Sequence, residues 1–252
     1  MKRFFVTDQG KVREHNEDAG GIFVNQAGQI LSVVADGMGG HQAGEVASKM
    51  VKEYFLQEWK KVSQINDSVE AEAWLSEHIK VINGQVFQHA EENIECKGMG
   101  TTVIAVIFLD EHLSIAHIGD SRCYRFQDGQ LEQVTDDHSF VNELVRSGQL
   151  SKEDAELHPR KNVLMRALGT NAFVDADIFS TSWHSGTRLL ICSDGLTDKL
   201  SDQDLIDQLA LTVPLKTIAE TMVSLANQRG GEDNITLALL EHEEMKAGDP
   251  DC

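Results

Sequence analysis

The chain has 252 residues, of which 41% are apolar, and its net charge is −19 at pH 7. This length fits one large domain or two small ones, and the apolar fraction is enough for a sizeable core, which excludes wholesale disorder. The acidic balance excludes recognition through a basic face, so we expect neither a nucleic-acid partner nor electrostatic attachment to an anionic membrane.

Short apolar runs predict ten strands along the chain. They cover residues 4–6, 22–24, 30–35, 101–109, 113–118, 122–126, 131–134, 178–182, 188–193 and 235–240. The short gaps between neighbouring runs favour antiparallel hairpins. Asp128-Gly129, which lies between two of these runs, is a typical hairpin turn.

Three longer stretches repeat apolar residues at helical spacing, namely 44–59, 68–92 and 215–227. In each stretch the apolar stripe covers one side only, so we expect each helix to lie on the surface with one face inward. Many antiparallel strands with a few one-sided helices predict an α+β protein in which helices cover layered sheets. This pattern does not favour a βαβ wound sheet.

The chain has no internal repeat and no Pro/Gly/Ser-rich linker, so we expect a single domain over residues 1–240. Residues 241–252 are polar and are expected to form a frayed tail. No interface signal stands out, and a monomer is the default expectation.

Several features favour a cytoplasmic protein. The longest apolar run, residues 103–109, is far shorter than the roughly 18 residues of a membrane span. The basic N-terminal residues lead directly into polar Thr7 and Asp8, without the apolar stretch of a secretory signal. No cysteine belongs to a Cys-x-x-Cys pair, and Cys123 and Cys192 lie within predicted strands, where they are expected as small core residues.

Aspartates recur where the predicted strands begin or end. Asp36 and Asp194 directly follow apolar strands, Asp233 precedes another, Asp120 lies where two strands meet, and Asp18 opens a strand. Taken singly, each is explained as turn punctuation, because Asp is common in turns. If these strand ends converge, the shared negative charge requires neutralising cations. Oxygen ligands without clustered His or Cys favour Mg²⁺, Mn²⁺ or Ca²⁺.

Six short motifs follow one another along the chain. They are Arg13-Glu14-His15-Asn16-Glu17-Asp18, Ala35-Asp36-Gly37-Met38-Gly39-Gly40-His41, Gly100-Thr101-Thr102, His117-Ile118-Gly119-Asp120-Ser121-Arg122, Cys192-Ser193-Asp194-Gly195 and Gly231-Glu232-Asp233-Asn234-Ile235-Thr236. In this order they closely resemble the metal-dependent protein phosphatases, the type 2C serine/threonine phosphatases, in their short bacterial form. The resemblance covers about the first 240 residues. It implies two antiparallel β-sheets packed face to face and flanked by helices on both sides, an α-β-β-α sandwich.

The resemblance also implies metal ligands. Asp36 would bridge two Mn²⁺ or Mg²⁺ ions, and the carbonyl oxygen of Gly37 would bind one of them. Asp194 and Asp233 would complete the other ion. A further acidic pair, Glu17 and its neighbour Asp18, matches a family position that serves the second ion directly or through water, and Asp18 is the favoured member. Asp120, together with Asp194, matches the position that holds a third, looser ion in bacterial members.

In such a site, two ions roughly 3.5–4 Å apart clamp the phosphoryl oxygens and hold a water that loses its proton near neutral pH. That water would attack phosphorus in line, so no covalent enzyme intermediate is required. By the resemblance, Arg13 would hold the substrate phosphate through its bidentate guanidinium, and His41 would be the general acid for the leaving alkoxide. Other histidines could compete with His41, namely His15, His117 and His138.

The expected function is therefore hydrolysis of phosphoserine and phosphothreonine in proteins, opposing a bacterial Ser/Thr kinase. Two alternatives stay open. The first is a catalytically inactive binding module on the same fold. The second is a phosphomonoesterase for small molecules, or a specialised regulator of one phosphorylated partner. A cysteine-dependent phosphatase is poorly supported, because Asp198 and not Arg lies six residues after Cys192.

Residues 138–169 match the family's mobile flap beside the active site. The pair Arg160-Lys161 is a rare positive cluster in this strongly acidic chain, and we hypothesise that it meets phosphorylated substrates. An ordinary helical connection is the alternative interpretation of this stretch.

Overall fold

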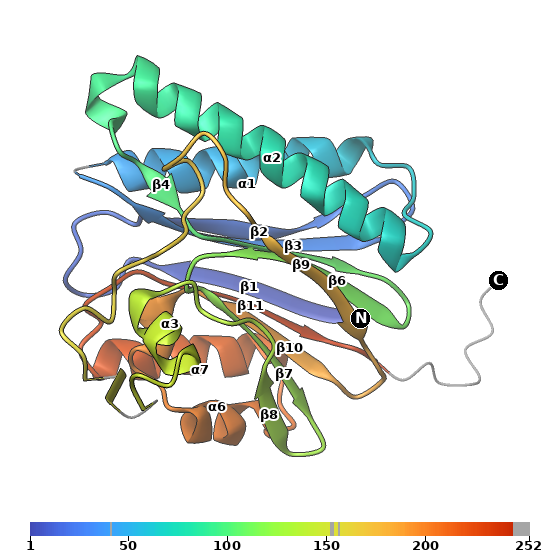
Figure 1. The fold of residues 1–252 in the computed structure, drawn as a ribbon. Coiled ribbons are helices and arrows are strands. Elements are labelled where there is room, and N and C mark those ends of the chain that lie inside the picture. Colours follow the sequence, from blue (N-terminus) through green and yellow to red (C-terminus); the bar gives the residue numbers. More distant parts are fainter. Residues whose placement is uncertain (41, 152–153, 156, 244–252) are drawn as a thin grey trace.

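The structure is a computed structural model that describes residues 1–40, 42–151, 154–155 and 157–243. Its strands form two antiparallel sheets packed face to face (Figure 1). One sheet has the order β1 (Lys2–Asp8), β11 (Ile235–Glu241), β10 (Arg188–Cys192), β7 (Arg122–Gln127) and β8 (Gln130–Gln133). The other has the order β2 (Asp18–Val24), β3 (Ile30–Met38), β5 (Val103–Phe108), β6 (His112–Ile118) and β9 (Asp177–Ser182), and the short β4 (Gly100–Thr101) pairs with β3.

Helices cover the outer face of each sheet, which confirms the predicted α-β-β-α sandwich (Figure 1). The sheet that contains β3 is covered by α1 (Ala43–Lys61) and α2 (Ser68–Glu92). The sheet that contains β11 is covered by α7 (Leu215–Gln228) and the shorter α5 (Asp194–Thr197) and α6 (Asp202–Leu209). Two short helices complete the described elements, α3 (Phe140–Arg146) and the 3-10 helix η1 (Ile94–Cys96).

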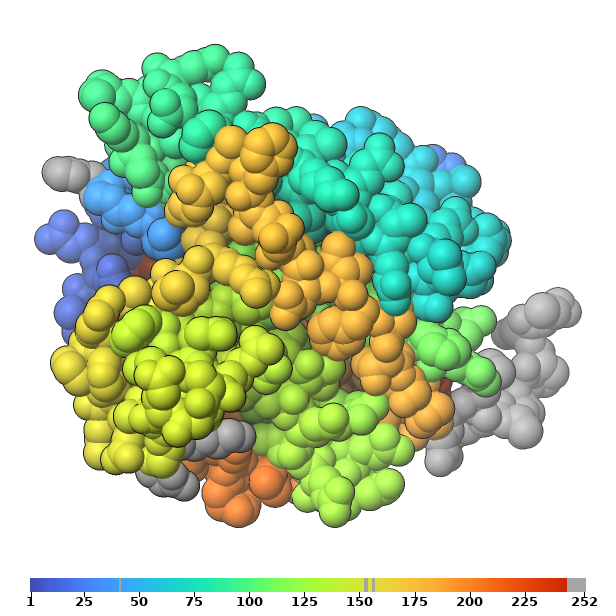
Figure 2. Space-filling model, viewed as in Figure 1, coloured from blue at the N-terminus to red at the C-terminus, as the bar shows by residue number. Residues whose placement is uncertain are grey.

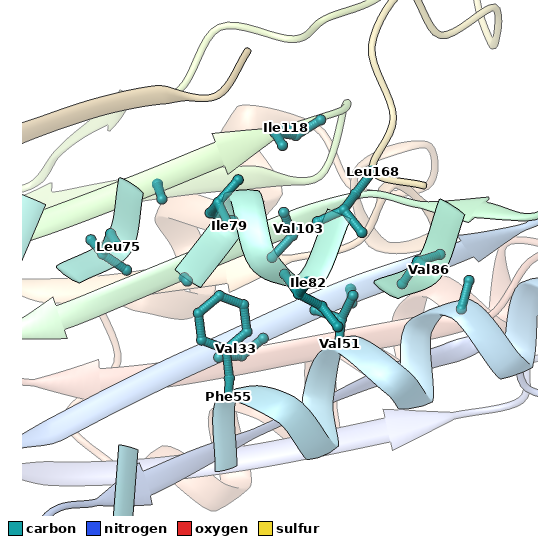
Figure 3. Close-up of a cluster of buried hydrophobic side chains, with 14 of the residues drawn as sticks. Val33, Val51, Phe55, Leu75, Ile79, Ile82, Val86, Val103, Ile118 and Leu168 are labelled. Carbon is teal, nitrogen blue, oxygen red and sulfur yellow. The ribbon is translucent and has the colours of Figure 1, made fainter. Parts of the chain in front are cut away.

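Strand β3 shows how alternation along a strand builds this layered core. Leu31 and Val33 pack with α1 and α2, and Ile30 and Val34 face the layer between the two sheets. Figure 3 shows the outer cluster, in which Phe55 of α1 and several side chains of α2 lie over Val33. Because β3 is buried on both faces, residues 30–35 of its sequence are apolar except for Ser32.

The predicted strands and the three long helices are present with small shifts at their ends, except that the predicted strand 101–109 is divided into β4 and β5. Asp128 and Gly129 have φ values of 51° and 77° and form the predicted turn between β7 and β8. Cys123 and Cys192 are buried as expected. Of the helices that the structure describes, none has both the length and the apolar character needed to cross a bilayer.

Candidate metal centre

The candidate site lies at the end of the sandwich where the two sheets meet. Asp18 and Asp36 are directly opposite each other in the pairing of β2 with β3. Asp194 follows β10 as the first residue of α5, and Asp233 precedes β11. A hydrogen bond joins the two sheets here, because the Ser193 hydroxyl donates to Asp18 Oδ2 at 2.7 Å. In Figure 1 this end is on the left, away from the N label.

Five aspartates from separate parts of the chain influence one another here, and we refer to them as the carboxylate cluster: Asp18, Asp36, Asp120, Asp194 and Asp233. Burial, and then the negative charge of its neighbours, raises the pKa of Asp36 well above its usual range. The same causes raise the pKa of Asp18 to about 7, that of Asp120 to about 8 and that of Asp194 to about 6. The acidic strand ends therefore lie near enough to one another to affect the pKa values of Asp18, Asp36, Asp120 and Asp194.

The residues of this cluster fit a hard divalent cation. Their side chains offer only oxygen atoms, which are the ligands that Mg²⁺ and Mn²⁺ prefer. Asp194 Oδ1 and Glu17 Oε1 are buried, and neither has a hydrogen-bond partner. Such an oxygen is costly to leave unpaired, and a cation would satisfy it.

The cluster is not a finished coordination shell. Within the described part of the chain, no three acidic, histidine or cysteine side chains are close enough together to enclose one ion. Several carboxylate oxygens are instead bonded to protein groups. Asp18 accepts from Ser193, and Asp233 accepts through Oδ2 from Arg13 at 2.8 Å and through Oδ1 from the backbone N–H of Asn234 at 2.8 Å. Ion binding would have to draw the carboxylates together.

The glycines beside the aspartates allow backbone segments to cross closely. A Cβ atom at Gly37 would collide with the carbonyl oxygens of Gly44 and Glu17. A Cβ atom at Gly195 would collide with the carbonyl oxygen of Asn234. The space beside these glycines is thus filled by the chain itself. The absence of a side chain at Gly37 and Gly195 allows α1 and α5 to pack against the loops that carry the cluster.

The proposed general acid, His41, lies outside the described residues. Of the competing histidines, His117 is enclosed in the core beside His138, and its ring nitrogens have no partner. Burial, and then the neighbouring His138, lowers the pKa of His117 to about 3. Burial also lowers the pKa of His138, which lies 3.2 Å from Asp177. Both rings are therefore uncharged at neutral pH, so neither is suited to act as the general acid for a leaving group.

Polar residues that the sequence did not single out complete the site. Ser193 holds Asp18, and the Thr102 hydroxyl accepts from the backbone N–H of Asp36 at 2.9 Å and pairs with Ser121. Asn234, next to Asp233, bonds to the loop that carries Arg13. These four residues, Ser193, Thr102, Ser121 and Asn234, all lie inside the six motifs, but their hydrogen-bond partners are set by the fold.

Comparison with known proteins agrees with this geometry. Residues 9–239 match the family model for Protein phosphatase 2C. The chain is 44% identical over 248 residues to the Serine/threonine phosphatase stp of Listeria welshimeri, with 98% of each chain covered. The crystal structure of Serine/threonine phosphatase Stp1 from Staphylococcus aureus superposes with a TM-score of 0.92 at 41% identity, covering 96% of this chain and 94% of that chain. The catalytic domain of PstP in complex with two manganese ions has a TM-score of 0.82 at 33% identity, covering 94% and 96%.

The sandwich and its carboxylate cluster, with these similarities, define a metal-dependent phosphoprotein phosphatase. The chain belongs to the protein phosphatase 2C family, and the resemblance drawn from the six motifs is confirmed.

Proposed function

We propose that this protein hydrolyses phosphoserine and phosphothreonine in proteins with the help of Mn²⁺ or Mg²⁺. The observation that carries the proposal is the carboxylate cluster at the junction of the two sheets, where burial and the neighbouring negative charges raise the pKa values of Asp18, Asp36 and Asp194. The Listeria and Staphylococcus relatives are named serine/threonine phosphatases, which supports the substrate class. We further propose that the substrates are products of a cognate Ser/Thr kinase and that the protein acts as a cytoplasmic monomer.

We propose that two divalent ions are held by Asp36, the carbonyl oxygen of Gly37, Asp194 and Asp233. Asp18 would serve the second ion, and Asp120 a third. The shared electrostatics of the carboxylates and the two manganese ions named for PstP support this arrangement. When bound, the ions supply Lewis acidity toward the phosphoryl oxygens and lower the pKa of a water.

The chain's own residues have separate tasks in this proposal. Arg13 would orient the phosphate through its planar guanidinium, which stays charged at any working pH. Its side chain is about half exposed, and it contacts Asp233 at the edge of the cluster, so it can reach a ligand from solvent. His41 would donate a proton to the leaving Ser or Thr oxygen. Ser193 would keep the Asp18 carboxylate turned toward the cluster.

We also propose that residues 1–240 are one catalytic domain. Strand β1 pairs along its whole length with β11, so the two ends of this span are joined in one sheet. The proposed flap subdomain, residues 138–169, includes α3, and its described residues form the yellow-green and yellow lobe at the lower left of Figure 2. The proposed tail, residues 241–252, lies mostly outside the described residues.

Release of inorganic phosphate from a phosphothreonine peptide and from p-nitrophenyl phosphate tests the proposed function. With Mn²⁺, we expect turnover of both substrates, and with EDTA we expect none, because the proposed hydrolysis needs the ions. Turnover of p-nitrophenyl phosphate alone would indicate a small-molecule phosphomonoesterase. No turnover of either substrate with Mn²⁺ would indicate an inactive binding module.

A double substitution in the flap, Arg160→Ala with Lys161→Ala, is expected to raise KM for phosphopeptides several-fold and to leave KM for p-nitrophenyl phosphate nearly unchanged. Lys161 reaches Asp198 at 3.0 Å, just beyond α5, and Arg160 lies over the Phe140 ring at 4.2 Å. Both cations therefore lie where a phosphorylated chain could replace their present partners. Steady-state kinetics on both substrates checks this, and unchanged phosphopeptide kinetics would count against the hypothesis.

A further inference from the structure

The loop that carries Arg13 has one side-chain bond within itself that reaches Arg13, from Gln9 Nε2 to the Arg13 carbonyl oxygen at 2.8 Å. Residues 9–17 join β1 to β2 without regular secondary structure, and residues 11–15 are exposed. An exposed loop without a backbone ladder has many conformations of similar free energy. This single bond ties Arg13 only to another residue of the same loop, so a contact from outside the loop is needed to fix Arg13 next to the carboxylate cluster.

The side chain of Asn234 bonds to both ends of this loop. It is 3% exposed, and its Nδ2 donates to the carbonyl oxygens of Gln9 and His15, at 2.8 and 2.9 Å. Its Oδ1 accepts from the backbone N–H of Glu17 at 2.8 Å. Both amide hydrogens and the amide oxygen are thus used on a single loop.

Asn234 also connects the loop to the carboxylate cluster. Its backbone N–H donates to Asp233 Oδ1, and Asp233 Oδ2 accepts from Arg13. A second tether lies nearby, where the backbone N–H of Lys11 donates to the carbonyl oxygen of Gly231 at 2.7 Å. The loop and the residues before β11 therefore form one hydrogen-bonded unit, with Asn234 at its centre.

We propose that Asn234 is a positioning residue. It holds the loop of residues 9–17 so that Arg13 contacts the phosphoryl group of a phosphoprotein bound next to the carboxylate cluster. This inference rests on the proposed function and deepens it. Asn234 itself would not touch the substrate. Its contribution is the preorganisation of Arg13 and of the Glu17 backbone, which otherwise has to be fixed during substrate binding.

We refer to the three side-chain hydrogen bonds from Asn234 to the loop as the clamp. Two substitutions remove it in different ways. Asn234→Ala removes all three side-chain bonds. Asn234→Asp keeps the shape and the acceptor for Glu17, but places a carboxylate oxygen against the carbonyl oxygens of Gln9 and His15. In both variants the carbonyl oxygens of Gln9 and His15 must accept hydrogen bonds from water instead, which frees the loop.

Steady-state kinetics with Mn²⁺ and a phosphothreonine peptide is the first test. For both variants we expect KM to rise about tenfold and kcat to change less, since phosphate positioning is lost. Asn25→Ala is the matched control. Asn25 is 7% exposed and its side chain also makes three hydrogen bonds, in the turn between β2 and β3, at the opposite end of β2. We expect it to lower the melting temperature and to leave KM unchanged.

A double-mutant cycle with Arg13→Ala separates positioning from general damage. If Asn234 acts through Arg13, then Asn234→Ala should lower kcat/KM less than about twofold when Arg13 is already Ala. An equal tenfold loss in both backgrounds would overturn the proposal.

Amide hydrogen exchange of the EDTA-treated protein gives a readout that needs no catalysis. In Asn234→Asp we expect the amides of residues 9–17 to exchange at least about tenfold faster than in wild type, and the amides of β5 to be unchanged. Unchanged exchange in this loop would refute the clamp even if the protein is an active phosphatase. Faster exchange in a protein that releases no phosphate would leave the clamp standing and refute the proposed function.

Discussion

Replacing Asp194 with alanine is expected to lower kcat/KM for Mn²⁺-dependent phosphate release by at least about 10³-fold. The negative charge of Asp194 contributes to the raised pKa values of Asp18, Asp36 and Asp120, so Asp194 lies close to three other members of the carboxylate cluster. Without it, the proposed ions lose a ligand, and with it several kcal/mol of charge stabilisation in the transition state. Release of phosphate from a phosphothreonine peptide over a series of Mn²⁺ concentrations measures this loss.

The same variant should fold normally without metal, and this distinguishes a lost ligand from a lost fold. Removal of one buried carboxylate relieves repulsion in the cluster, so the melting temperature in EDTA should equal or exceed that of wild type. Asp207→Ala is the control, because Asp207 is an exposed acid on α6, away from the cluster. Wild-type activity in Asp194→Ala would contradict the proposed metal centre.

Without metal, the protein is expected to lose stability as the pH rises from about 5 to 8. The pKa values of Asp18, Asp120 and Asp194 are about 7, 8 and 6 in the fold, and near 4 in an unfolded chain. Between these values the folded state binds more protons than the unfolded state, so the free energy of unfolding falls with increasing pH. The stabilising effect is complete below about pH 4 and is lost as the pH passes through the folded pKa values. We expect a decrease of at least about 2 kcal/mol.

Mn²⁺ should reverse this trend, because cations and protons compete for the same oxygens. Urea unfolding at pH 5.5 and 8.0, with EDTA and with Mn²⁺, gives the free energies directly. We expect the stabilisation by Mn²⁺ to be larger at pH 8.0 than at pH 5.5. Identical unfolding with Mn²⁺ and with EDTA at both pH values would show that the acidic loops do not bind metal.

The strands and long helices could be predicted because buried positions are occupied by apolar residues, which recur along the sequence with the period of the strand or helix. Strand β3 is buried on both faces, and residues 30–35 are apolar except for Ser32. Helix α2 carries a one-sided apolar stripe over its 25 residues. Helix α6 is not among the predicted helices, because its eight residues are fewer than the stretch over which helical periodicity is recognised. Its capping box, from Ser201 to Asp204, is a start signal that the sequence does contain.

The candidate site was predictable only in part. Its acidic residues mark strand ends, but the sequence does not show which ends meet. Asp18 faces Asp36 through the register of β2 with β3, and Asp233 is brought near them because β11 pairs with β1. The partners of Asn234 lie more than 200 residues away along the chain, at Gln9 and His15. No local pattern specifies such contacts, because they depend on the tertiary fold.

The pairing of β1 with β11 has a consequence for biosynthesis. Strand β11 is the last of the described strands to be translated, and it must insert between β1 and β10. Asp233 and Asn234 immediately precede β11. Neither residue can reach its position in the site before β11 has been synthesised and has paired with its neighbours. Contacts of such high sequence separation form slowly. A nascent polypeptide therefore has no assembled carboxylate cluster, and phosphatase activity requires that β11 has left the ribosome and paired with β1 and β10.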